Sequence, residues 1–88
     1  MAMNPVLIDR AARGLADGSL PPADLVRTSG RMTSGATCAL CGDEVPAGSH
    51  IIELIATSQP SLCMHVECHT AWLTAWLRAK SQRETATI

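Results

Sequence analysis

A chain of 88 residues forms a single small domain, and its apolar fraction of 47% includes 13 alanines but no Phe or Tyr to fill a core. Such a core supplies little free energy beyond the entropy cost of folding, so a staple such as a bound metal is expected. The net charge of −1 lacks the basic excess typical of nucleic-acid-binding proteins.

Uninterrupted apolar runs are short throughout the chain, and none approaches the roughly 20 residues that a membrane helix needs. Residues 6–8 are too brief for the apolar region of a secretory signal and are followed at once by Asp9 and Arg10. We therefore expect a cytoplasmic protein that has no membrane contact. In a reducing compartment, four cysteines near three histidines indicate metal ligands before disulfides.

The first predicted element is a helix from Pro5 to Asp17. Asn4 suits the N-cap, Pro5 suits the first helical position, and Gly18 ends the helix. Apolar residues recur at helical spacing on one face, namely Ile8, Ala11, Ala12 and Leu15. Residues 22–26 favour one further helical turn, so residues 1–27 are predicted to form an N-terminal helical arm.

Residues 28–37 are rich in Thr, Ser, Gly and Arg, a composition that predicts a flexible linker. Beyond it, β-branched residues dominate 50–56 and predict a strand, while 57–61 have turn chemistry and 62–65 can return as a second strand. A β-hairpin is therefore expected between two groups of Cys and His residues.

The apolar period becomes helical from Val66, which predicts a helix to about Gln82 and a frayed tail over 83–88. Trp72 and Trp76 share an apolar stripe on this helix, which is typical of core residues. The predicted fold is thus a small α+β zinc-stabilised domain: N-terminal helix, flexible linker, zinc knuckle, β-hairpin and C-terminal helix, with residues 38–82 as the zinc-finger module.

Cys38 and Cys41 have the spacing with which a tight turn presents two sulfurs to one zinc ion. Gly42 fits that turn, because the backbone must bend there and its amides can point at the thiolates. Residues three apart lie on one face of a helix, so His65 and Cys68 in a first helical turn would point together toward this knuckle. The preferred ligands of one structural Zn²⁺ are therefore Cys38, Cys41, His65 and Cys68.

Other ligand pairs remain open at this point. His65 with His69 would give a site of two Cys and two His, Cys63 with His65 would share one face of a strand, and His50 is a further candidate. The preferred interpretation makes Cys63 a buried free thiol, His50 a strand-edge histidine, and His69 an exposed or supporting histidine.

A knuckle at Cys38 and Cys41, a hairpin, and His65-x2-Cys68 opening a helix resemble the treble-clef type of zinc finger, whose relatives include LIM-like and RING-like half-sites. The chain also resembles small uncharacterised bacterial zinc-binding proteins in which a short helix and a Gly-x-Leu-Pro segment, here residues 18–21, precede such a finger. The resemblance implies a fold and a bound zinc, and it implies no particular activity.

Catalysis is not expected. His65-Val66-Glu67 together with a Cys-x2-Cys pair is similar to part of the zinc deaminase signature, but the order of the two motifs is reversed. Four protein ligands also close the coordination sphere to substrate. A zinc hydrolase or deaminase that uses Glu67 is therefore only a remote alternative, and no small-molecule substrate is expected.

Two non-enzymatic functions remain. In the first, the protein is an interaction or adaptor module that binds another protein, or its own copy, through the apolar face of the N-terminal helix. In the second, a regulatory zinc finger binds nucleic acid through basic residues late in the C-terminal helix, namely Arg78, Lys80 and Arg83. The acidic balance and the scarcity of aromatic residues favour the first function.

Overall fold

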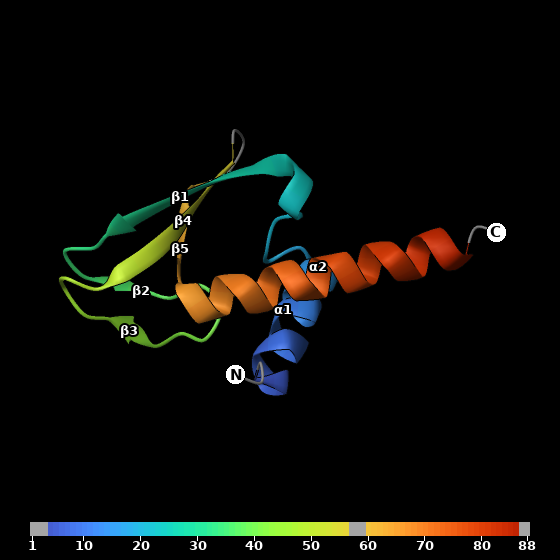
Figure 1. Cartoon of the computed structure of the whole chain (residues 1–88), viewed down its shortest axis with the longest axis horizontal. Coiled ribbons are helices and arrows are strands. Elements are labelled where there is room, and N and C mark those ends of the chain that lie inside the picture. The colour runs from blue at the N-terminus through green and yellow to red at the C-terminus, as the bar shows by residue number, and fades with distance from the viewer. Residues whose placement is uncertain (1–3, 57–59, 87–88) are drawn as a thin grey trace.

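The computed structural model describes residues 4–56 and 60–86. Within these ranges the chain forms two α-helices, a short 3-10 helix and five strands (Figure 1). In chain order they are α1 (Pro5–Asp17), η1 (Ala23–Leu25), β1 (Val26–Met32), β2 (Ala36–Thr37), β3 (Glu44–Val45), β4 (His50–Ala56), β5 (Leu62–His65) and α2 (Val66–Ala86).

Helix α1 has the predicted bounds and the predicted caps. The Asn4 side chain accepts a hydrogen bond from the amide of Val6 at 2.9 Å, and Pro5 occupies the first turn. Gly18 ends the helix with a φ of 85°, a left-handed conformation that glycine adopts without steric cost. The further helical turn predicted for 22–26 is also present, as η1.

A three-stranded antiparallel sheet has the order β1-β4-β5. The predicted hairpin is confirmed, because β4 and β5 pair in a register that runs from Ile51 opposite His65 to Leu54 opposite Leu62. Residues 57–59 of the predicted turn lie outside the described residues. A second, two-stranded sheet pairs β2 with β3 on either side of the Cys38–Cys41 turn.

The prediction of a flexible linker over residues 28–37 is wrong. Strand β1 pairs with β4 along its whole length, from Val26 opposite Ala56 to Met32 opposite His50. Thr33 extends the pairing, since its amide donates to the Ser49 carbonyl at 3.0 Å. The polar composition is compatible with a strand because β1 is an edge strand, in which backbone hydrogen bonds provide the pairing while the side chains stay exposed.

Helix α2 organises the core. It packs against β4 and β5 near its N-terminal end, while α1 lies against its middle (Figure 1). The largest fully buried side chains are those of Trp72, Ile51, Leu54, Met64, Val45 and Cys38. Trp72 therefore takes the predicted core position, whereas Trp76 is only half-buried.

Helix α2 continues to Ala86, which corrects the tail predicted to fray from residue 83. Residues 81–86 contain no Gly or Pro to end the helix, and most of them are good or neutral helix formers. Residues 87 and 88 of the predicted tail lie outside the described residues. In the described parts of the chain, neither helix combines the length and the apolar character needed to cross a membrane.

Candidate metal centre

Four side chains from three separate segments converge at the N-terminal end of α2. They are Cys38, Cys41, His65 and Cys68, and their candidate ligand atoms all lie within 4.8 Å of one another. The Nδ1 atom of His65 lies 3.4 Å from the Sγ atom of Cys41 and 3.8 Å from that of Cys68. All four cysteines are free thiols. The preferred set from the sequence is thus the set that the fold brings together.

The turn that carries Cys38 and Cys41 is fixed by backbone hydrogen bonds. The amide of Gly42 donates to the Cys38 carbonyl at 3.0 Å, and the amide of Cys38 donates to the Asp43 carbonyl at 2.9 Å. Gly42 has a φ of 79°, which a side chain would strain. The tight turn predicted from the Cys-x2-Cys-Gly pattern is therefore present.

Strand β5 and helix α2 position the other two donors. His65 is the last residue of β5, and Cys68 lies in the first turn of α2. This differs from the prediction that both lie on the first helical turn, but residues three apart still converge where the strand passes directly into the helix. The amide of Ala39 donates to the Cys63 carbonyl at 2.8 Å, which anchors the knuckle to β5.

The environment of Cys38 favours its thiolate. Burial of the sulfur opposes ionisation, but hydrogen bonds from the backbone amides of Cys41, His65 and Leu40 outweigh this effect and lower the pKa of Cys38 to about 6. Amides of the knuckle thus point at a sulfur, as the sequence predicts, although they belong to Leu40 and Cys41 rather than Gly42.

The environment of Cys68, in contrast, disfavours its thiolate. Burial of its thiol and the negative charge of the neighbouring Cys38 and Cys41 sulfurs raise the pKa of Cys68. The proximity of the three sulfurs therefore opposes their simultaneous ionisation, and a cation among them would favour it. A metal ion held at the centre of the group would offset the repulsion between the thiolates.

The donor spacing agrees with this interpretation. Nitrogen and sulfur ligands that surround one tetrahedral ion at bond lengths of roughly 2.0–2.3 Å stand about 3.5 Å apart. The two distances from His65 fall on either side of that value. The group therefore fits a single metal ion held by three sulfurs and one nitrogen. In the described residues it is the only group of three or more Cys, His, Asp or Glu side chains with this convergence.

The remaining candidate ligands have other contacts. Cys63 lies on β5, where its sulfur is 3.9 Å from the guanidinium Nη2 of Arg31. The ring of His69 packs against Trp72 with a centroid distance of 5.6 Å, and burial lowers the pKa of His69. His50 is exposed at the start of β4. None of the three belongs to the converging group.

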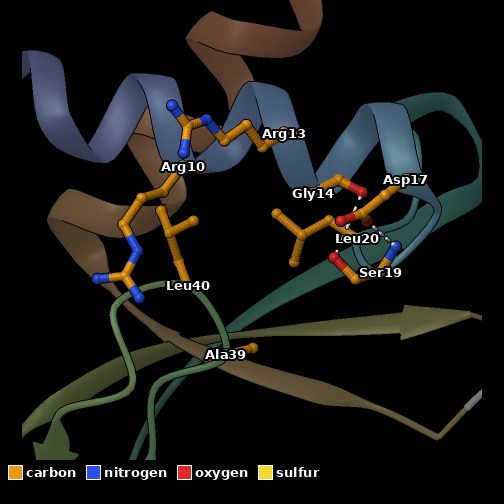
Figure 2. A pocket seen from close by; sticks show the side chains of 8 residues that line it. All are labelled: Arg10, Arg13, Gly14, Asp17, Ser19, Leu20, Ala39 and Leu40. Carbon is orange, nitrogen blue, oxygen red and sulfur yellow. Dashed lines mark hydrogen bonds between the residues drawn. The ribbon is translucent and has the colours of Figure 1, made fainter.

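Helix α1 covers the outer side of the knuckle. Figure 2 shows the pocket of about 230 Å³ between them, where the Arg10 side chain extends from α1 toward the Ala39–Leu40 turn. Leu40 is buried here, as is Leu20 from the segment that follows α1. The turn that carries Cys38 and Cys41 therefore lies beside the N-terminal helix and is hydrogen-bonded to β5.

A second pocket, of about 460 Å³, opens beside the donors themselves. Asp43, His50 and Glu67 line it together with Cys41, His65 and Cys68. No sequence pattern links these three residues, because they come from the knuckle, β4 and α2 and meet only in the folded chain. The sequence analysis considered Glu67 only for a remote catalytic alternative, and it did not place Asp43 near the candidate metal centre.

No protein-family model, curated protein or solved structure matches this chain.

Proposed function

We propose that this protein is a small interaction module of the treble-clef type, in which one structural Zn²⁺ holds the fold together and no reaction is catalysed. The observation that carries the proposal is the convergence of three sulfurs and one imidazole nitrogen from the knuckle, β5 and α2. A site built from segments so far apart in sequence is a cross-link between them.

The donor set supports zinc. Thiolate and imidazole ligands in a tetrahedral group are typical of structural zinc sites, whereas calcium and magnesium require oxygen ligands. Copper(I) and iron also accept thiolates, so the metal content of the purified protein decides the identity. The treble-clef assignment draws support from the order of elements, in which a knuckle is followed by a hairpin and then by a helix that carries the last ligand.

A structural role follows from the number of donors. Four protein ligands fill a tetrahedral coordination sphere and leave no position for a substrate or an activated water molecule. Glu67 lines the pocket beside the donors, but a general base there has no metal-bound water to act on. The remote deaminase alternative is therefore not proposed further.

For the interaction surface we propose the groove between α1 and α2. It is a pocket of about 560 Å³ whose walls are mostly apolar: Ala12, Leu15, Ala16, Pro22, Trp76, Ala79 and Gln82. The central part of the apolar face of α1 is already used inside the molecule, since Ala11 is fully buried. Helix α1 therefore contributes only the edge of its apolar face to the groove, and it is not a free arm.

The proposed occupant is an apolar helix of another protein. Three of the groove residues are alanines, whose small side chains let a helix approach closely. Leu77 is 51% exposed on α2 and extends the apolar surface of this helix. A second copy of this chain would present the same surfaces, and an oligomeric-state measurement separates it from a different partner.

Elemental analysis of purified protein tests the metal. We expect one zinc per chain, loss of zinc in Cys68→Ala, and retention in the matched variant Cys63→Ala, which removes a sulfur that lies outside the donor group. A strong chelator should abolish the circular-dichroism signal of α2, because metal binding and folding are coupled in domains of this size. Zinc lost from Cys63→Ala and kept in Cys68→Ala would contradict the site.

Affinity capture with a matched pair of variants tests the surface. Ala16→Glu places a charge in the groove, while Val6→Glu places the same charge on an exposed residue of α1 that does not line it. We expect a protein partner that is lost with Ala16→Glu and kept with Val6→Glu. Equal retention by both variants, or a retained nucleic acid whose binding weakens steeply with salt, would overturn the proposal.

A further inference from the structure

The four donors of the candidate metal centre differ in burial and in their access to the pocket beside it. Cys38 and Cys68 are buried, with 1% and 3% of their surfaces exposed, whereas Cys41 and His65 are only half-buried. The half-buried pair lines the pocket of about 460 Å³ together with Cys68, whereas Cys38 is not among its lining residues. One face of the site is thus shielded by the core, and the opposite face is accessible.

We propose that this pocket is the port through which the metal ion enters and leaves the folded protein, with His50 at its wall as a transit ligand. The inference rests on the proposed zinc function and adds a route and a named residue to it. An incoming ion that approaches from the pocket meets Cys41 and His65 first. Cys68, which is buried but also lines the pocket, and the buried sulfur of Cys38 then complete its coordination.

The charge of the pocket favours a cation. The carboxylates of Asp43 and Glu67 line it, and no Lys or Arg is among its lining residues. Three thiolates and one neutral imidazole around a divalent ion leave one net negative charge at the base of the pocket. A pocket with charges of one sign raises the local concentration of oppositely charged ions and speeds their association.

His50 adds a donor of the type that the metal prefers. It is the first residue of β4, and it reaches the pocket together with His65, which lies near it at the end of the neighbouring strand. An imidazole in this position can bind an ion while one of the half-buried ligands is displaced. Exchange by way of such an intermediate ligand avoids unfolding of the chain.

Metal replacement in the zinc-loaded protein tests the port. Added Cd²⁺ displaces zinc from thiolate sites, and its thiolate complex absorbs in the ultraviolet, so the exchange rate can be followed directly. We expect the rate to rise with Cd²⁺ concentration and then to saturate. Glu67→Gln and His50→Gln should each slow the exchange about three- to tenfold at low salt, and high salt should reduce the effect of Glu67→Gln.

The matched control is Glu44→Gln, which removes the same charge from a residue next to Asp43 that does not line the pocket. It should exchange within about twofold of the unchanged protein. A rate that does not depend on Cd²⁺ concentration would show that zinc dissociates before Cd²⁺ binds, which excludes exchange by way of a transit ligand, and it would overturn the proposal. Exchange at the wild-type rate in both Glu67→Gln and His50→Gln would also overturn the port. An equal slowing of exchange in the control Glu44→Gln would overturn it as well.

Failure of the port and failure of the proposed function give different results. A purified chain without zinc contradicts the proposed function before any exchange is measured. A chain with one zinc that exchanges independently of Glu67 and His50 contradicts only the port.

Discussion

The indole nitrogen of Trp72 donates a hydrogen bond to the carbonyl oxygen of Pro21 at 3.0 Å, across 51 residues of sequence. Both residues are buried, and Trp72 is 1% exposed. Trp72 lies one turn after Cys68 on α2, and Pro21 belongs to the segment that leads from α1 toward β1. The contact therefore joins the helix of the metal centre to the N-terminal part of the chain.

Trp72→Phe should destabilise the zinc-loaded protein by about 2–4 kcal/mol. The substitution leaves the Pro21 carbonyl buried without a donor, which costs about 1–3 kcal/mol, and it also removes apolar volume from the core. Denaturant unfolding at a fixed free zinc concentration measures the change, because bound zinc adds to the apparent stability.

The matched variant Trp76→Phe, at a half-buried ring 5.3 Å from Lys80 Nζ, should cost less than about 1.5 kcal/mol. Equal costs would show that the hydrogen bond contributes nothing.

Gly14→Ala tests how closely the segment after α1 packs on that helix. A Cβ atom at residue 14 would lie 2.6 Å from Cδ1 of Leu20, which is itself buried. Overpacking costs about 1–3 kcal/mol, against a helix-propensity gain of about 1 kcal/mol, so we expect a net loss of stability in thermal unfolding. In a Leu20→Ala background the contacts with the Leu20 side chain disappear and only Ser19 Oγ stays close, at 3.2 Å, so the same substitution should become less destabilising. Stabilisation by Gly14→Ala in the unchanged protein would contradict this packing.

Local chemistry explains what could be predicted from the sequence. The bounds of α1 follow from Asn4, Pro5 and Gly18, each of which acts on the backbone next to it. The hairpin and the start of α2 follow from a change in apolar period at Val66. The four donors follow from short spacings within two segments, Cys-x2-Cys and His-x2-Cys, which limit how the side chains can converge.

The features that sequence reasoning missed depend on contacts between distant segments. Strand β1 exists because β4 offers it a free edge, and its own exposed polar side chains carry no strand pattern. The pocket beside the metal likewise joins residues from three elements. Neither feature has a local signal, so no reading of 28–37, of Asp43 or of His50 alone could find it.

Gly30→Ala tests whether β1 is a strand in solution. Gly30 lies in the middle of β1 opposite Ile52, and an added Cβ would make an ordinary contact of 3.7 Å with Cδ1 of that residue. Because glycine loses more conformational entropy than alanine when a strand forms, we expect a gain of about 0.5–1 kcal/mol in denaturant unfolding. The control Gly35→Ala should destabilise, since residue 35 has a φ of 125°. An unchanged stability in Gly30→Ala would favour the flexible linker predicted from composition.

His69 distinguishes the preferred ligand set from the alternative in which His65 and His69 complete the site. His65 places its Nδ1 atom 3.4 Å from the Cys41 sulfur, whereas the ring of His69 packs against Trp72. His65→Ala should weaken zinc binding by about 100-fold or more, because four ligands share a binding free energy of about 10–16 kcal/mol. His69→Ala should keep the zinc affinity within about fivefold, since it removes only a ring contact that stabilises the fold.

Competition with a chromophoric chelator measures both affinities under the same conditions. A loss of affinity in His69→Ala as large as that in His65→Ala, or larger, would make His69 a ligand and exclude the site formed by Cys38, Cys41, His65 and Cys68.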